Sequence, residues 1–331
     1  MSSIPLTPGG GNLLLYGGWE GCGMRVAVWG GGSLGLLWAD RLAGRFPETI
    51  LITRTRAQRD EIEARGLRVT GIDGACYHRD LQVEWAGSER LPRLDAVFIT
   101  VKQRILPRIA PRLAEVCSPS APLFLWQNGL GGERFFLPYF SPGQIYRAVT
   151  TEGALRKGPA DVCHTGSGES WVGPACGGDF SPVVERLIQE LSSESVPIHS
   201  AADLRQRVWE KLAVNCVINP LTALWKLPNG ALPERDGFSS RMEEILGEVA
   251  QVARMEGIPL SVVELRKKIL SVCRRTATNR SSMLQDLDRG EPTEVDFING
   301  AVVEIGRKRG VPTPHNEHLT RLIHQAEGGT D

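Results

Sequence analysis

The chain has 331 residues, of which 41% are hydrophobic and 23% charged, and its formal net charge is zero. This composition is typical of a globular protein long enough for two domains. Without a basic block or a long apolar run, we expect neither a nucleic-acid partner nor a membrane-associated protein. The seven cysteines are scattered without a C-x-x-C pair, which favours reduced thiols in a cytoplasmic protein over disulfides or a zinc site.

The first 23 residues differ from the rest of the chain. They are rich in glycine and have no hydrophobic periodicity. We therefore expect residues 1–23 to form a disordered extension and the folded part to begin at Met24. A start site assigned too far upstream would explain the same segment.

A short strand followed by a glycine-rich turn opens the folded part. Residues 25–29 form an apolar run with two valines, and an apolar helical pattern begins near residue 36. Between them, Gly30, Gly32 and Gly35 match G-x-G-x-x-G in the strand–turn–helix context that dinucleotide binding requires. The helix N-terminus would offer free N–H groups to a pyrophosphate. The alternative is a glycine-rich turn that binds no ligand.

The second predicted strand, at residues 49–53, indicates which nucleotide is preferred. An Asp or Glu at the end of this strand would bind the ribose hydroxyl groups of NAD. This chain has Arg54 there, followed by Arg56. Because a guanidinium group suits a 2′-phosphate, the sequence favours NADPH over NADH. The alternative is a solvated basic loop.

Strands and helices continue to alternate up to about residue 200, which predicts a doubly wound α/β domain over residues 24–200. Ligands of such sheets bind beyond the carboxyl ends of the strands. Lys102 and Asn128 follow two buried apolar runs, so they are candidate ligand contacts, although such residues can also simply form turns. Helices are predicted at 57–65, 105–117 and 181–192, and further strands at 67–70, 81–85, 95–101, 123–126, 146–154, 170–172 and 196–199.

Strand signals end near residue 203, and the pattern predicts an all-helical domain over residues 201–331. Pro220 lies inside the first predicted helix, where it is expected to kink or break the helix because it lacks an N–H group. The predicted helices cover residues 203–226, 238–256, 261–275, 279–289, 293–309 and 315–326.

Three polar residues of that first helix, Lys211, Asn215 and Asn219, are spaced four apart within an apolar sequence. Four residues advance a helix by about 400°, so the three side chains share one face. A buried ammonium group or amide is costly without a partner. The stripe therefore either faces water or lines a functional site.

Three motifs, in chain order, resemble the 2-dehydropantoate 2-reductase (ketopantoate reductase) family. They are the glycine loop, KLAVNCVINPLTA from Lys211, and NRSSMLQD from Asn279 followed by TEVDFING from Thr293. The resemblance extends from Met24 to about Thr320. It implies a Rossmann-type domain followed by an all-helical domain, with the active site in the cleft between them. It also implies reduction of 2-dehydropantoate to pantoate by NADPH, a step toward coenzyme A.

The resemblance assigns roles to individual positions. Lys211 matches the family's general acid, and Glu294 matches a carboxylate that contacts substrate, lysine and cofactor. The roles of Asn279 and Asp286, in the same motifs, are less defined. Asn128 matches a residue that contacts both substrate and cofactor. Lys102 matches a residue that contacts the cofactor or the substrate. The other matched positions are Asn215, Asn219, Asn229 and Ser282 for the substrate and Gly30, Gly32, Gly35 and Arg54 for the cofactor.

One position departs from the family pattern. Members often carry glutamine three residues after the lysine that Lys102 matches, whereas this chain has Ile105 there and Gln103 next to the lysine. The acidic residues between Asp286 and Glu294 could suggest Mg²⁺, but we favour a solvated turn and a reaction without metal.

The expected partner is a small 2-oxo acid, and the helical domain could support a homodimer. Ser282 could instead cap a helix, and Asn229 could instead form a turn. Two other functions remain open, namely reduction of another branched 2-oxo acid and a non-catalytic NADP-binding regulator. A regulator would not need the Lys211–Glu294 pair.

Overall fold

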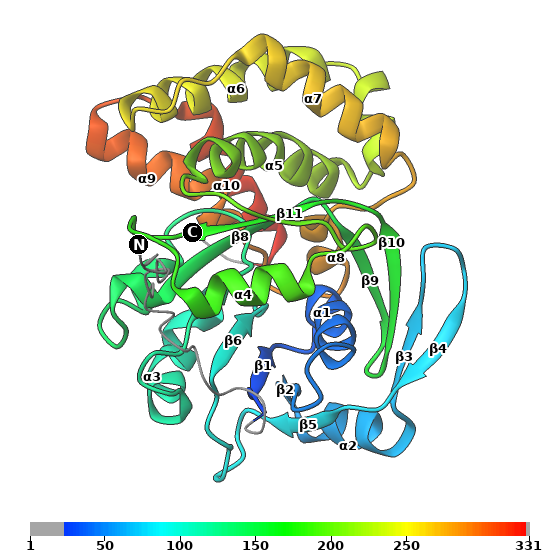
Figure 1. Ribbon diagram of the computed structural model, residues 1–331. Coiled ribbons are helices and arrows are strands. Elements are labelled where there is room, and N and C mark those ends of the chain that lie inside the picture. Colours follow the sequence, from blue (N-terminus) through cyan, green and yellow to red (C-terminus); the bar gives the residue numbers. More distant parts are fainter. Residues whose placement is uncertain (1–22, 329–331) are drawn as a thin grey trace, which may run out of the picture.

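The computed structural model describes residues 23–328, so the extension predicted over residues 1–23 lies, apart from Gly23, outside the described part. Residues 23–200 contain the strands and are called the sheet part, and residues 205–326 are called the helical part (Figure 1). The fold class predicted from the sequence, a Rossmann-type sheet followed by a helical region, is confirmed. In the described part of the chain, no helix is both long and apolar enough to cross a membrane.

An eight-stranded sheet with the order β12-β11-β8-β7-β6-β1-β2-β5 forms the centre of the sheet part. Its strands pair in parallel except for β8 with β11, which are antiparallel. The strands of this sheet are β1 Val26–Trp29, β2 Ile50–Thr53, β5 Gln82–Trp85, β6 Ala96–Ile99, β7 Leu123–Leu125, β8 Ile145–Thr150, β11 Ser170–Pro174 and β12 Ile198–Ser200.

Helices cover both faces of this sheet, because its central strands are apolar on both sides. Trp38 of α1 packs on one face, where its ring lies 4.4 Å from that of Trp126. Leu106 and Leu113 of α3 pack on the opposite face. The helices of the sheet part are α1 Ser33–Ala43, α2 Arg56–Arg65, α3 Leu106–Val116 and α4 Pro182–Leu191.

A second, four-stranded sheet with the order β4-β3-β10-β9 was not predicted. Its strands are β3 Leu67–Thr70, β4 Cys76–Arg79, β9 Gly153–Gly158 and β10 Asp161–Gly166. The single strand predicted at 146–154 is wrong, since the chain leaves the large sheet after β8 and enters the small one as β9. Most side chains of β4 and β9 are exposed or half-buried, so they carry no apolar alternation that would reveal a strand.

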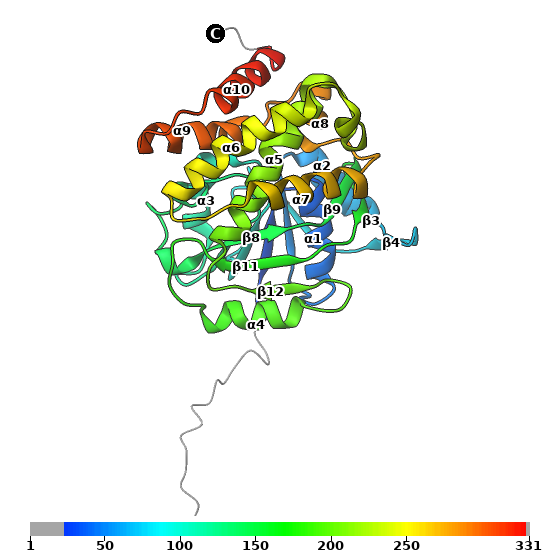
Figure 2. The ribbon, with the colours of Figure 1, turned by 90° about the horizontal axis from the view of Figure 1, so that it is seen from above.

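The helical part is built around one central helix, α5 Arg205–Trp225, whose apolar residues join the cluster formed by its neighbours (Figures 1 and 2). The predicted helices are found, although residues 293–309 divide into a short 3₁₀ turn and a helix. The other elements are η4 Asn229–Glu234, α6 Phe238–Met255, α7 Val262–Arg275, α8 Ser282–Asp288, η5 Val295–Phe297, α9 Asn299–Arg309 and α10 Pro314–Ala326.

Pro220 does not break α5, so of the two predicted outcomes, a kink or a break, the break is wrong. A proline leaves the carbonyl group four residues earlier, here that of Cys216, without its helical donor. Asn299 at the start of α9 replaces that donor, because its Nδ2 lies 3.0 Å from the Cys216 carbonyl oxygen. Asn299 is fully buried. Its side chain therefore allows the helix to continue through the proline.

Candidate active site

The glycine loop between β1 and α1 has the geometry that a dinucleotide requires. Gly30 has a φ of +129°, which favours glycine. A Cβ atom on Gly35 would collide with the Gly30 carbonyl oxygen, so α1 can approach β1 only with glycine there. A Cβ on Gly32 would meet nothing within 4 Å. The open side of the loop lies where backbone can approach a pyrophosphate, so these residues fit a dinucleotide.

Two arginines lie at the end of β2. Arg54 is exposed immediately after the strand, as a residue that meets an adenosine 2′-phosphate would be. The Arg56 guanidinium instead stacks on the ring of Trp85 at 5.2 Å from its centre. The NADPH preference assigned to Arg54 remains a prediction.

The sequence interpretation missed Arg156, which reaches the glycine loop from β9. Its backbone N–H donates to Ser33 Oγ at 3.0 Å, and its Nη1 donates to the Gly31 carbonyl oxygen at 3.2 Å. Gln58 donates to the same carbonyl oxygen at 2.8 Å. The Arg156–Lys157 pair was the only available signal, and it could not be placed because β9 itself was not predicted.

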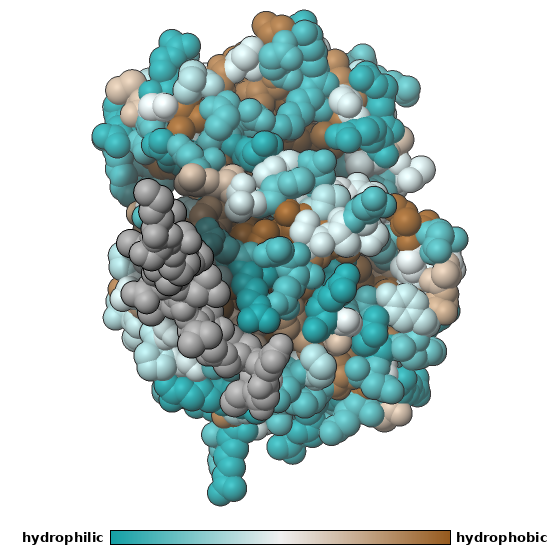
Figure 3. Space-filling view, viewed as in Figure 1, coloured by the Kyte–Doolittle hydropathy of each residue, from teal (hydrophilic) through white to brown (hydrophobic). Residues whose placement is uncertain are grey.

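The second part of the site lies where the sheet part meets the helical part. Apolar side chains emerge along this boundary on an otherwise mainly hydrophilic face (Figure 3). Gly129, in the loop after β7, has a φ of +87°, and a Cβ there would collide with the Phe297 carbonyl oxygen. Leu130 also donates its N–H to that oxygen at 3.0 Å. This close approach brings the loop that carries Asn128 against the turn that follows Glu294.

Lys102 connects the two parts through an ion-pair cluster. Its Nζ lies 2.9 Å from Asp286 Oδ2 and 3.4 Å from Glu294 Oε2, and both carboxylates are buried. The backbone N–H of Gln103 donates to Glu294 Oε1 at 3.0 Å. Burial by itself would lower the pKa of Lys102, but the two carboxylates outweigh it and raise that pKa. Lys102 is therefore a fixed positive charge.

Lys211 has the opposite electrostatic character. It projects from α5, and its Nζ donates to the Thr150 carbonyl oxygen at the end of β8 at 3.0 Å. Burial lowers the pKa of Lys211 to about 8, and the negative charge of Glu294 partly opposes that shift. A lysine with such a pKa can donate a proton near neutral pH and bind one again. Glu294 thus acts electrostatically on both lysines.

The predicted amides lie on three different elements, namely the loop after β7, α5 and η4. Gln103 Nε2 donates to the Asn128 carbonyl oxygen at 2.7 Å, which fixes the loop after β7. Asn215 is half-buried and Asn219 buried on α5, so the polar stripe does not simply face water. Asn229 is buried and donates to Thr276 Oγ1 at 2.8 Å. Its Oδ1 is buried and has no hydrogen-bond partner within residues 23–328.

Ser282 is the first residue of α8 and is exposed. The cap of this helix is Ser281, whose Oγ accepts from the Leu284 N–H at 3.1 Å. The alternative role of Ser282 as the helix cap is therefore wrong. Its assignment to the substrate, like that of Asn229, remains a prediction. Asn279 contributes its backbone carbonyl oxygen, which accepts from the Asn229 N–H at 2.9 Å.

The acidic residues of this region are occupied by cations of the chain itself. Asp286 pairs with Arg289 as well as with Lys102, and Glu291 lies 3.8 Å from Arg289. Within the described residues, no group of three or more His, Cys, Asp or Glu side chains is arranged to hold a metal ion.

Comparison with known families and proteins gives a consistent result. Two family models match, "Ketopantoate reductase PanE/ApbA" over residues 26–177 and its C-terminal counterpart over residues 203–327. A 2-dehydropantoate 2-reductase of Archaeoglobus fulgidus is 32% identical over 308 residues, covering 92% of this chain and 98% of that protein. One of Vibrio cholerae is 33% identical, with the same two coverages.

Solved structures agree with these matches. A PanE/ApbA family ketopantoate reductase from Ralstonia eutropha JMP134 aligns with a TM-score of 0.82 and 28% identity. A D-mandelate dehydrogenase with NADH and anilino(oxo)acetate aligns with a TM-score of 0.86 and 26% identity. Each alignment covers 92% of this chain and 99% of the other. The chain therefore belongs to the ketopantoate reductase family and is an oxidoreductase.

Proposed function

We propose that this enzyme reduces the ketone of 2-dehydropantoate to pantoate with NADPH, which is a step toward coenzyme A. The observation that carries the proposal is the pair of unlike lysines around Glu294, since one has a raised pKa and the other a lowered one. Reduction of a 2-oxo acid needs a fixed cation for its carboxylate and a mobile proton for its carbonyl oxygen. The two lysines meet these two needs.

Lys211 is the proton donor in this scheme. With a pKa of about 8, its amine is mainly protonated at pH 7 and can release its proton to an oxygen on which negative charge develops. The Thr150 carbonyl oxygen fixes one N–H of this amine. Another N–H can then point at the substrate.

Lys102, Glu294 and the amides orient the substrate. The positive charge of Lys102 suits the carboxylate of a 2-oxo acid, and Asp286 holds this charge in place. Glu294 can accept a hydrogen bond from the substrate hydroxyl group while it raises the pKa of Lys211. The side chains of Asn215, Asn219 and Asn229 add neutral polar contacts. Such contacts bind a carboxylate or hydroxyl group without adding charge.

The cofactor is assigned to the glycine loop and Arg54. When bound, the nicotinamide supplies the hydride. The open side of Gly32 and the N-terminus of α1 suit the pyrophosphate, and the exposed Arg54 suits a 2′-phosphate. Arg156, which already contacts the loop, adds positive charge beside it.

A second candidate is reduction of a different 2-oxo acid. It is favoured by the similarity to D-mandelate dehydrogenase, whose structure holds NADH and anilino(oxo)acetate. A non-catalytic NADP-binding role is less well supported, because a regulator does not need a lysine with a lowered pKa.

A substrate panel tests the proposal. The purified enzyme is given 2-dehydropantoate, other branched 2-oxo acids and aromatic 2-oxo acids, each with NADPH and with NADH, while cofactor absorbance is followed. We expect the highest kcat/KM for 2-dehydropantoate with NADPH. A higher value for an aromatic 2-oxo acid, or oxidation of neither cofactor with any acid, would contradict the proposal.

A further inference from the structure

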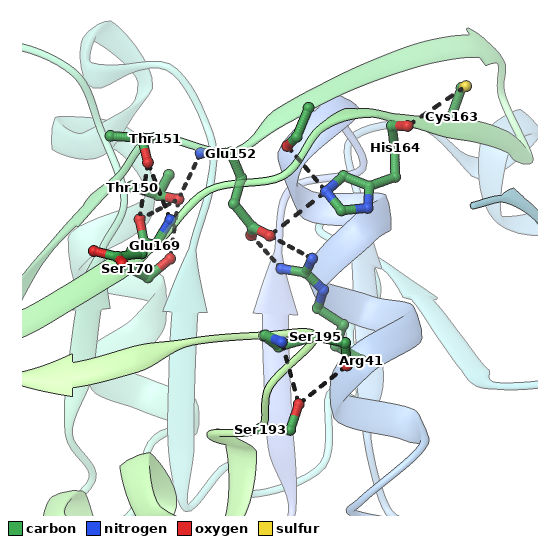
Figure 4. A network of polar contacts seen from close by, with 12 residues as sticks. Arg41, Thr150, Thr151, Glu152, Cys163, His164, Glu169, Ser170, Ser193 and Ser195 are labelled. Carbon is green, nitrogen blue, oxygen red and sulfur yellow. Dashed lines mark hydrogen bonds and ion pairs between the residues drawn. The ribbon is translucent and has the colours of Figure 1, made fainter. Parts of the chain in front are cut away.

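A buried ion pair lies outside the cluster of Lys102 and Glu294. It joins Arg41 of α1 to Glu152 in the connection between β8 and β9, and the two side chains are 10% and 2% exposed. His164 Nε2 of β10 lies 3.6 Å from Glu152 Oε1. Figure 4 shows the Arg41 guanidinium and the His164 ring both directed at this carboxylate. A buried ion pair adds little to stability by itself. We therefore ask what this pair holds in place.

Glu152 also fixes the residue that contacts Lys211. Its backbone N–H donates to Thr150 Oγ1 at 3.1 Å, and Ser170 Oγ of β11 lies 2.9 Å from the same Oγ1 (Figure 4). The Thr150 carbonyl oxygen accepts the hydrogen bond from Lys211 Nζ. Glu152 is therefore connected to Lys211 through Thr150, whose hydroxyl group accepts from the Glu152 backbone and whose carbonyl oxygen accepts from the lysine.

The connection between β8 and β9 needs such an anchor. β8 belongs to the large sheet and β9 to the small sheet, so the chain changes sheets within residues 151–152 and the ladder of β8 ends at Thr150. The anchor comes from α1, the helix whose N-terminus lies at the glycine loop. The acceptor of Lys211 is thus tied to the helix that carries the predicted cofactor site.

We propose that Glu152 is a positioning residue, which holds the Thr150 carbonyl oxygen against Lys211 through its ion pair with Arg41. The kinetic part of this inference rests on the proposed function, in which Lys211 is the proton donor. A fixed carbonyl oxygen favours the ammonium form of the lysine over the amine. Loosening the Thr150 carbonyl group therefore lowers the pKa of Lys211 and misdirects its proton.

The chain provides a matched control in the neighbouring residue of α1. Asp40 is also buried, and it forms an ion pair with Arg79 of β4 at 2.8 Å and accepts from Tyr77 Oη at 2.7 Å. It links the same helix to the small sheet, whereas Glu152 links that helix to the connection that precedes β9. Its contacts lie on β4, away from the connection that holds Thr150. Asp40→Asn thus removes a comparable ion pair without touching the path to Lys211.

The test compares Glu152→Gln with Asp40→Asn. Competitive labelling of lysines with isotopic acetic anhydride, followed by peptide mass spectrometry across pH, reports the pKa of Lys211 in the enzyme without cofactor or substrate. The pH profile of kcat, the Kd of NADPH and the Tm are measured in parallel. Arg41→Lys, which keeps the charge but loses the paired hydrogen bonds, serves as a milder second variant.

We expect Glu152→Gln to shift the labelling midpoint of Lys211 to lower pH and to reduce kcat about tenfold, since small misplacements of a catalytic group cost this much or more. The Kd of NADPH should stay within about twofold, since the glycine loop is unchanged. Arg41→Lys should shift the midpoint in the same direction by less. Asp40→Asn should lower only the Tm.

An unchanged labelling midpoint in both Glu152→Gln and Arg41→Lys, with a fall in Tm like that of Asp40→Asn, would overturn the proposal. Lys211→Ala separates this failure from that of the proposed function. If Lys211→Ala keeps its kcat, the proton donor is another group, whereas the labelling result still decides whether Glu152 positions Lys211.

Discussion

At the scale of single residues, the site depends on how Glu294 is shared between two lysines. Lys102 has a second carboxylate, Asp286, at 2.9 Å and keeps its charge. Among residues 23–328, Lys211 has the Thr150 carbonyl oxygen and the field of Glu294, and burial dominates its pKa. The same buried carboxylate thus supports a fixed cation on one side and the proposed proton donor on the other.

Glu294→Gln tests this division of roles. Removing the negative charge removes the Coulombic attraction that raises the pKa of Lys211, so that pKa should fall below about 8 and the alkaline loss of kcat should begin at lower pH. Lys102 keeps Asp286 and should stay charged. The measurement is the pH profile of kcat for the oxo acid. An alkaline limb at the same pH as in the unmodified enzyme would show that Glu294 does not act on the proton donor.

Two arginines near the glycine loop are expected to contact different phosphate groups of the cofactor. Arg54→Asp should raise the KM for NADPH far more than that for NADH, because one charge-assisted contact to the 2′-phosphate, about 1.5–3 kcal/mol, is lost. Arg156→Ala should weaken the binding of both cofactors to a similar extent, since this residue contacts the loop itself. Equal KM values for the two cofactors in the unmodified enzyme would contradict the role of Arg54.

At the scale of elements, the continuity of α5 depends on a side chain 79 positions further along the chain than Pro220. Asn299 supplies the Cys216 carbonyl oxygen with a donor and also donates to Asn316 Oδ1 at 3.0 Å. The Asn316 side chain in turn donates to the buried Glu248, which also accepts from the first N–H groups of α10. A carboxylate at a helix N-terminus is stabilised by the helix dipole. The network fixes α5, which carries Lys211, against α6, α9 and α10.

Asn299→Ala should therefore destabilise the fold by about 1–3 kcal/mol, the cost of a buried polar group without a partner. Pro220→Ala restores an N–H group for the Cys216 carbonyl oxygen. In a protein that already carries Pro220→Ala, Asn299→Ala should lower the free energy of unfolding by less than it does in the unmodified protein. Urea unfolding of the four proteins gives the coupling. Strict additivity would show that Asn299 does not compensate for the proline.

At the scale of the whole molecule, specific polar contacts join the two parts. Lys102 and Gln103 of the sheet part contact Glu294, and Lys211 of the helical part contacts Thr150. These same residues form the candidate site. The contacts that join the two parts are therefore made by the same side chains that form the candidate site. Because Lys211 is buried, its ammonium form is expected to lower the free energy of unfolding near neutral pH.

The pH dependence of unfolding tests this cost. Because the folded pKa of Lys211 is about 8 and the unfolded value is about 10.4, the unfolded state binds more protons between these pH values. Stability should rise across that window, and the penalty should be fully present below pH 8. Lys211→Met should thus be more stable than the unmodified enzyme at pH 7, by about 1–3 kcal/mol, with the advantage shrinking toward pH 10. A constant difference across pH, in chemical denaturation, would contradict this.

The sequence could predict the elements that have a hydrophobic period and the residues that follow them. The glycine loop, the apolar strands of the large sheet and the helices around α5 all carry such a period. The small sheet and Arg156 could not be predicted, because β4 and β9 are largely exposed. The unbroken α5 could not be predicted either, since it depends on Asn299, which is distant in sequence. Motif resemblance assigned Lys211 and Glu294, but their unlike electrostatic settings depend on packing between the two parts.

Proton donation by Lys211 is tested most directly by the pH profile of kcat for Lys211→Ala, measured beside that of the unmodified enzyme. The unmodified enzyme should lose activity as pH rises through about 8, and the variant should lack that limb with kcat lower by roughly 10²–10⁴-fold. NADPH binding should persist, because the glycine loop and Arg54 are unaltered. A variant with near-normal kcat and the same alkaline limb would contradict the account and make Lys102 the first candidate for the proton donor.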